Sequence, residues 1–156
     1  MQVGEKENER GWDVYEEARK CGVIIATAHD HSYGRTYPMS NFMNQTIANC
    51  SNSLNITEGR TFAFLPGLGG ANIHDQKMNE LWWAKIYTKT QDATHSAVFG
   101  VFNVDDMSNK AMFYFKNVQG EGIGCIDVIN NIHCKATTPQ KQALSLKTFI
   151  IQTTKG

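Results

Sequence analysis

The feature that most constrains the fold is a helix pattern followed at once by a buried-strand pattern. Trp12 to Lys20 (WDVYEEARK) carries acidic side chains early and basic ones late, as the helix dipole favours. Gly22 suits a helix end, because glycine readily adopts the left-handed backbone common there. Val23 to Ala26 is a continuous apolar run of strand length, typical of a parallel strand buried on both faces. This helix–strand unit predicts an α/β or α+β fold.

Further strands are expected downstream. Thr61 to Leu65 is predicted to be a second strand, closed by the glycine-rich turn Gly67 to Gly70. Ala97 to Val104 and Ala111 to Val118 are rich in aromatic and β-branched residues, as strands are. The polar cluster between them predicts that they pair as an antiparallel hairpin.

Three other stretches are less regular. Residues 34–59 are rich in Asn, Ser, Thr and Gly, and we predict a long loop, a kind of segment that usually carries function. Residues 75–87 are predicted to be helical, with two adjacent tryptophans supplying apolar bulk. After Gly120 the pattern weakens, and residues 140–153 fit either a strand or a helix.

Composition excludes several classes of protein. The 156 residues carry 15 basic and 15 acidic side chains, and this balance argues against a nucleic-acid binder or a polybasic membrane binder. No apolar run approaches the roughly 18 residues that a membrane-spanning helix needs. A chain of this length is expected to form one domain, at about 150 residues per domain.

Sequence signals for the cellular compartment point in two directions. Three N-glycosylation sequons begin at Asn44, Asn49 and Asn55, and they favour an extracellular or secretory-pathway protein. Residues 1–11 are polar and lack the hydrophobic stretch of a signal peptide, so a signal would lie upstream of the sequence given. Four cysteines allow three pairings or four reduced thiols, and the sequence does not choose between them: Cys21, Cys50, Cys125 and Cys134.

The segment best suited to chemistry is His29-Asp30-His31, directly after the first predicted strand. Residues i and i+2 of an extended chain point to the same side, so both imidazoles can face one pocket. Ligand sites in open α/β sheets lie at the carboxyl ends of strands, and imidazole suits zinc and iron. The pattern indicates a candidate metal site with His29 and His31 as ligands and Asp30 facing away. Two surface histidines on an ordinary loop are the alternative.

The surrounding segment, Ala26 to Thr36 (ATAHDHSYGRT), resembles the last metal-binding motif of the calcineurin-like metallophosphoesterases. More closely it resembles their purple acid phosphatase-like branch, in which a strand ends in Gly-His-x-His followed by an aromatic residue, Glu, Arg and Ser or Thr. The turn Gly67 to Gly70 is also similar to the glycine-rich strand end of that branch. The likeness implies a partial metallophosphoesterase β-sandwich with flanking helices, a mixed sheet and a C-terminal antiparallel hairpin. The expected divisions are a polar N-terminal segment at 1–11, the C-terminal half of such a domain at 12–121, and a divergent extension at 122–156.

The resemblance implies a metal-dependent phosphoric ester hydrolase acting on a small phosphate ester. His29 would bind one ion of a two-metal centre and His31 the other, with zinc, iron or manganese as the metals. Arg35 stands where the branch has its own arginine, and would hold an anion or orient the loop; a structural ion pair is an equal alternative. Ala28 replaces the glycine of the branch, and its upstream Asp, Asn and His ligands have no counterpart in this chain.

Two imidazoles cannot complete a two-metal centre. We therefore expect the remaining ligands to come from a missing N-terminal half. A half-domain would also expose sheet edges and an apolar face, which predicts a homo-oligomer or filament. A non-catalytic binding or self-assembling module that keeps the scaffold is the alternative function, and an unrelated secreted α+β domain is a third.

The remaining histidines offer weaker candidates. His74 could approach the same strand end, but the sequence favours a simpler role for this dipeptide, with Asp75 starting a helix. His95 is expected to be structural or exposed. His133 and Cys134 have no second ligand pair at zinc-finger spacing, so no zinc site is predicted there.

Overall fold

The computed structural model describes residues 2–51, 53–130 and 149–152 of the chain. Within these residues the protein is mostly β, with one α-helix. Helix α1 (Asp13–Lys20) leads directly into strand β1 (Ile24–Thr27), which confirms the first two elements predicted from the sequence. The other elements are β2 (Tyr33–Thr36), β3 (Met39–Asn41), β4 (Thr46–Ile47), β5 (Ser53–Ile56), β6 (Ala63–Pro66), β7 (Trp83–Tyr87), β8 (Ser96–Phe102), β9 (Lys110–Asn117), β10 (Gly122–Asn130), β11 (Phe149–Gln152) and the 3-10 turns η1 (Lys89–Gln91) and η2 (Val104–Asp106).

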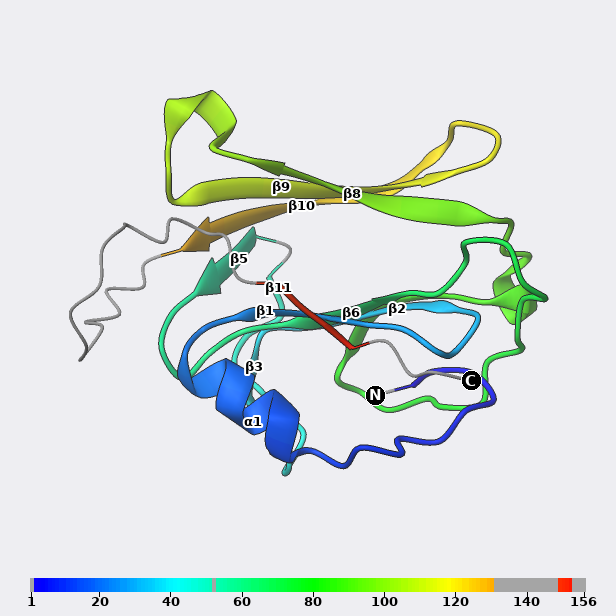
Figure 1. Ribbon diagram of the computed structural model, residues 1–156, viewed down its shortest axis with the longest axis horizontal. Coiled ribbons are helices and arrows are strands. Elements are labelled where there is room, and N and C mark those ends of the chain that lie inside the picture. The colour runs from blue at the N-terminus through cyan, green and yellow to red at the C-terminus, as the bar shows by residue number, and fades with distance from the viewer. Residues whose placement is uncertain (1, 52, 131–148, 153–156) are drawn as a thin grey trace.

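Two mixed sheets face each other as a sandwich, and α1 covers the outer side of the first sheet (Figure 1). The first sheet has the order β11-β1-β6-β2-β7, in which β1 is parallel to β6 and β11 while β2 is antiparallel to both of its neighbours. The second has the order β5-β10-β9-β8, with β10 parallel to β5 and antiparallel to β9. The antiparallel pairing of β8 with β9 confirms the predicted hairpin. The predicted partial sandwich is therefore confirmed, and the described residues contain one α-helix where flanking helices were expected.

The central strands β1 and β6 are buried on both faces, because a core lies on each side of the first sheet. In β1, Ile24 points between the two sheets and Ile25 points toward α1. In β6, Phe64 joins the core between the sheets and Leu65 joins the core beneath α1. This alternation explains why the β1 segment is a continuous apolar run in the sequence.

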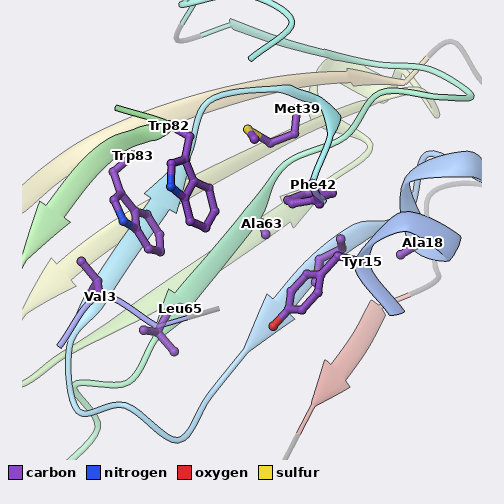
Figure 2. Close-up of a cluster of buried hydrophobic side chains, with 10 residues drawn as sticks. Val3, Tyr15, Ala18, Met39, Phe42, Ala63, Leu65, Trp82 and Trp83 are labelled. Atoms are coloured by element: carbon purple, nitrogen blue, oxygen red, sulfur yellow. The ribbon is translucent and has the colours of Figure 1, made fainter. Parts of the chain in front are cut away.

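The core beneath α1 is closed by residues from distant parts of the chain (Figure 2). Tyr15 and Ala18 project from the helix onto the sheet, and Val3 of the N-terminal segment is fully buried beside them. Trp82 and Trp83 complete the cluster with stacked rings whose centroids lie 4.7 Å apart. The polar N-terminal segment is thus anchored by one apolar side chain.

The prediction of a long loop at residues 34–59 is wrong. Strand β2 lies between β6 and β7 with all four residues buried, and β3, β4 and β5 follow it. The Thr36 hydroxyl accepts a hydrogen bond from the backbone N–H of Ala63, while Met39 and Phe42 are fully buried. The polar composition of residues 34–59 suggested a loop, although some of these polar side chains are buried and form hydrogen bonds with backbone groups.

The predicted helix at residues 75–87 is also wrong. Its second half is the strand β7, which pairs antiparallel with β2 and places Tyr87 opposite Tyr33 and Lys85 opposite Arg35. Pairing with β2 and the packing of the tryptophans into the core outweigh the local helix propensity of this stretch.

Residues 122–156, predicted as an extension, supply strands to both sheets. Strand β10 lies between β5 and β9, and β11 pairs with β1 at the edge of the first sheet. His133, Cys134 and most of residues 140–153 fall outside the described part of the chain.

Surface features predicted from sequence are only partly visible. Asn44 is exposed, whereas Asn55 is half-buried within β5, and glycosylation at Asn44, Asn49 and Asn55 stays a prediction. Cys21 and Cys50 are exposed free thiols among the residues described. Across that same part of the chain, no helix is long and apolar enough to cross a membrane.

Candidate functional site

The turn between β1 and β2 carries the predicted metal ligands. His29 adopts a φ of 96°, a left-handed backbone that non-glycine residues rarely take. Its Nε2 lies 3.6 Å from Oε1 of Glu9, and the side chain is only 23% exposed. Such strained backbone persists only where the surrounding structure holds it, and it is often found at functional sites.

Asp30 holds this turn from inside the protein. The residue is fully buried, and its carboxylate accepts hydrogen bonds from the backbone N–H groups of Val3 and Gly4. The Ser32 hydroxyl donates a further hydrogen bond to it over 3.0 Å. A buried carboxylate is costly unless hydrogen-bonded, and here the N-terminal segment supplies two of the donors.

His74 contacts the same carboxylate. Its Nδ1 lies 2.6 Å from Oδ1 of Asp30. A carboxylate can only accept a hydrogen bond, so the Nδ1 of His74 carries the proton. The backbone nitrogen of His31 lies 3.4 Å from the same Nδ1, but two N–H groups cannot form a hydrogen bond with each other. In the neutral ring, Nε2 therefore keeps its lone pair.

The His31 ring lies against His74. The two imidazoles are stacked, with centroids 4.5 Å apart and planes at 28°. The Nδ1 of His31 lies 2.9 Å from the backbone carbonyl of Asn72, which can only accept, so this nitrogen also carries its proton. Both rings therefore use Nδ1 as a donor and leave Nε2 with a lone pair.

The glycine-rich turn after β6 packs directly on the histidine turn. A Cβ on Gly67 would lie 1.8 Å from the Asp30 carbonyl oxygen, a distance that no side chain tolerates. The Gly67 N–H donates to the Ser32 carbonyl over 2.9 Å. Only glycine permits the two turns to pack this closely, and this packing brings the segment that carries His74 next to the histidine turn.

Arg35 lies deeper than the sequence suggested. It is 3% exposed, within β2, and its Nη1 donates to the carbonyl of Thr36 over 3.4 Å. Burial lowers the pKa of Arg35, and the neighbouring Tyr33 hydroxyl partly offsets this effect. Burial has the opposite effect on the acidic hydroxyl of Tyr33 and raises its pKa. The guanidinium is therefore enclosed by the sheet and interacts with a tyrosine at the start of β2.

The structure brings together a different set of side chains from the predicted one. His31 is joined by His74 and, through His74, by Asp30, whereas His29 faces Glu9. The sequence favours a helix start at Asp75 over a role for His74 at the strand end, but among the described residues no helix begins there. The position of His74 just after the glycine-rich turn was the signal for its role.

Over the residues that the structure describes, no three His, Cys, Asp or Glu side chains gather closely enough to hold a metal ion. His95 is exposed, as predicted, and its Nε2 lies 3.1 Å from the Ala71 carbonyl oxygen.

The fold has a counterpart among solved structures. The chain matches a purple acid phosphatase from seeds of yellow lupin (Lupinus luteus) over 85% of its own length, with a TM-score of 0.57 and 17% sequence identity. The described fold is part of a purple acid phosphatase fold. The chain spans only 23% of the length of that enzyme, and at this identity the likeness concerns the fold alone. No family model and no curated protein matches the sequence.

Proposed function

We propose that this chain supplies part of the active site of a metal-dependent phosphoric ester hydrolase, with His29 and His31 as metal ligands. The observation that carries the proposal is the state of the His31 ring, which donates Nδ1–H to the Asn72 carbonyl and leaves Nε2 free to bind an ion. Histidines that bind metals almost always donate their other nitrogen in this way. The purple acid phosphatase fold supports the proposal by placing the turn at the end of a buried parallel strand.

Two ions of zinc, iron or manganese, when bound, would polarise a phosphate ester and lower the pKa of a bound water. The residues of this chain would present and orient the ligands. Asp30 fixes the turn to the N-terminal segment, and the surrounding structure holds His29 in its strained conformation. The burial of Arg35 beside Tyr33 favours orientation of the loop over direct contact with an anion.

The proposal needs further ligands. The described residues contain no group of three His, Cys, Asp or Glu side chains that could hold a metal ion. The chain spans only 23% of the length of the phosphatase it resembles. The missing ligands would come from further polypeptide, such as an N-terminal half or another copy of the chain. Catalytic metal sites in proteins usually need about three protein ligands per ion.

The test uses this chain together with the further polypeptide that supplies the missing ligands, and measures bound metal and hydrolysis of p-nitrophenyl phosphate in the wild type, in a His29→Ala/His31→Ala double variant and in His95→Ala. We expect metal-dependent turnover in the wild type and in His95→Ala, because the Nε2 of His95 lies against the Ala71 carbonyl and His95 is not one of the proposed ligands. The double variant should lose metal and turnover together. A wild type without bound metal and without turnover would contradict the proposal.

A second function, self-assembly without catalysis, is favoured by the outer face of the second sheet. Phe99 on β8 stacks on Tyr114 of β9, with ring centroids 5.2 Å apart, and yet is 45% exposed. Val101 on the same strand is 40% exposed, and β8 is an edge strand of the sheet as described. Exposed apolar edges of this kind favour association with other chains.

Light scattering at micromolar concentration tests the assembly function. We expect the wild type to form an oligomer and Val101→Lys to shift it toward monomer. Val14→Lys is a matched control, since Val14 is 38% exposed on α1, away from β8. A monomeric wild type, or an equal effect of both lysine variants, would exclude assembly through this face.

A further inference from the structure

We propose that two copies of this chain pair through strand β8, edge to edge and antiparallel, in a closed dimer whose second sheets form one continuous sheet. The inference rests on the assembly function proposed above and deepens it by naming the partner and the contact. It depends on neither hydrolysis nor a metal. In the described part of the chain, β8 (Ser96–Phe102) lies at the edge of the second sheet and pairs only with β9 (Figure 1).

The first support is a row of backbone groups along the open edge of β8. The Val118 N–H donates to the His95 carbonyl, so His95 and every second residue after it turn their backbone groups toward β9. The alternate residues turn their N–H and C=O groups to the open edge, and these residues are Ser96, Val98, Gly100 and Phe102. The Ser96 N–H donates to the Leu68 carbonyl, whereas Val98 and Gly100 have no backbone partner on that side among the described residues.

The second support is that β8 lacks the features that protect sheet edges. Its seven residues, SAVFGVF, include no charged residue and no proline. Charges and prolines on edge strands hinder pairing with other chains. Strand β7, at an edge of the first sheet, carries such a charge, because Lys85 within it is exposed. Strand β8 therefore offers a long, uncharged edge to another strand.

The third support is the fit of β8 to a second copy of itself. In an antiparallel pair centred on Gly100, Phe99 of each copy lies opposite Val101 of the other on the outer face, where both side chains are exposed. An aromatic side chain opposite a β-branched one is a favourable cross-strand pair. Because both copies use the same surface, the contact occupies both edges and closes at two copies. We therefore expect a dimer and no filament.

The fourth support is charge, which favours a second copy over an unrelated partner. Lys116 is exposed on β9 near the N-terminal end of β8, and Asp106 is exposed just beyond the C-terminal end. Antiparallel pairing brings the N-terminal end of one β8 to the C-terminal end of the other. Lys116 of each copy therefore lies at the same end of the joined sheet as Asp106 of its partner, and the opposite charges favour this register.

The other charged groups considered at these two ends already have partners. Asp105 pairs with Lys110 over 2.6 Å, and the Glu121 carboxylate accepts a hydrogen bond from the Asn117 amide over 2.9 Å. Within the described residues, Lys116 and Asp106 form no ion pair. Both charges are thus available to a second copy.

The test measures the mass of the wild-type chain by light scattering and its amide hydrogen exchange by NMR, each over a range of concentrations. We expect a dimer at micromolar concentration. As the dimer forms, exchange of the Val98 and Gly100 amides should slow about 10-fold or more. The amides of Phe99 and Val101, which face β9, should change little.

A charge exchange tests the antiparallel register. Lys116→Glu should weaken the dimer about 10-fold, because it places like charges together at each end of the contact. The Lys116→Glu/Asp106→Lys double variant should restore the dimer, because it exchanges the two charges. Lys85→Glu is the matched control, since Lys85 is exposed on the first sheet, and it should dimerise as the wild type does.

Each other outcome overturns a distinct part of the account. An oligomer whose Val98 and Gly100 amides still exchange fast would refute edge pairing and leave the assembly function standing. A wild type that stays monomeric would refute both. A chain that is monomeric alone, and gains this protection only with the further polypeptide proposed to supply the missing ligands, would refute self-pairing. A double variant weaker than Lys116→Glu would refute the antiparallel register.

Discussion

The imidazole Nδ1 of His74 lies 2.6 Å from the buried carboxylate Oδ1 of Asp30, a residue 44 positions earlier in the chain. The same carboxylate accepts the backbone N–H groups of Val3 and Gly4. One side chain therefore holds together the turn after β1, the segment after β6 and the N-terminal segment. The arrangement of the side chains in the candidate site therefore depends on the Asp30 carboxylate.

Replacing Asp30 should destabilise the whole domain. Asp30→Ala leaves two buried backbone N–H groups and a histidine without their acceptor, and we expect a loss of about 3 kcal/mol or more in the free energy of unfolding. Urea denaturation measures it. Asp105→Ala is the control, because Asp105 is an exposed residue that pairs with Lys110 on the surface. Equal stability of the two variants would refute a structural role for Asp30.

A methyl group on Gly67 should be as damaging as the loss of that carboxylate. Gly67→Ala forces its Cβ against the Asp30 carbonyl oxygen, and a backbone shift costing about 3 kcal/mol is expected. Gly69→Ala is a matched change two residues away, since nothing lies within 4 Å of its Cβ position. Thermal unfolding should separate the two variants clearly. Similar melting temperatures would mean that the two turns do not pack as described.

The strained backbone at His29 is expected to lower the stability of the fold. His29→Gly relieves the left-handed φ of 96°, whereas His29→Ala keeps it. We expect the glycine variant to be more stable than the alanine variant by about 1 kcal/mol, while both lack the ligand. Denaturant unfolding compares them. A glycine variant no more stable than the alanine variant would show that this backbone is unstrained.

Parts of the fold could be predicted because their signals are local. The β1 run is apolar since both faces are buried, and β8 and β9 are rich in strand-forming residues around a polar turn. Strands β2 and β7 could not be predicted, because they are stabilised by non-local pairing: β2 pairs with both β6 and β7, and β7 pairs with β2. Arg35 and Thr36 made β2 look like a polar loop, although both are buried.

The candidate site shows the same division. The sequence placed His29 and His31 at a strand end, because a histidine pair directly after an apolar run is visible locally. The contact of Asp30 with His74 depends on the packing of two turns through Gly67, which no local pattern encodes.

Glu16 should make stability depend on pH. Its partial burial alone would raise its pKa, but hydrogen bonds from Arg19 and from the backbone N–H of Phe42 outweigh this and lower the pKa of Glu16 below the usual 4.5. A group whose pKa is lowered by folding stabilises the protein above its unfolded-state pKa, and the effect disappears as pH falls through the folded-state value. The stabilisation is thus expected at neutral pH and lost progressively below about pH 4.5.

Glu16→Gln should therefore be less stable than the wild type at pH 7, by about 1 kcal/mol, and the difference should shrink in acid. Urea unfolding at several pH values measures this. Glu17→Gln is the control, because Glu17 is exposed and pairs with Lys20 at the surface. A Glu16 effect that stays constant down to pH 3 would show that its charge contributes nothing.

The most direct test of a metal site at this turn is a crystal structure grown with zinc, with diffraction recorded on both sides of the zinc absorption edge. We predict an anomalous peak about 2.1 Å from Nε2 of His31. Peaks found only at the exposed thiols of Cys21 and Cys50, or at His95, would contradict the account, as would the absence of any peak at the turn.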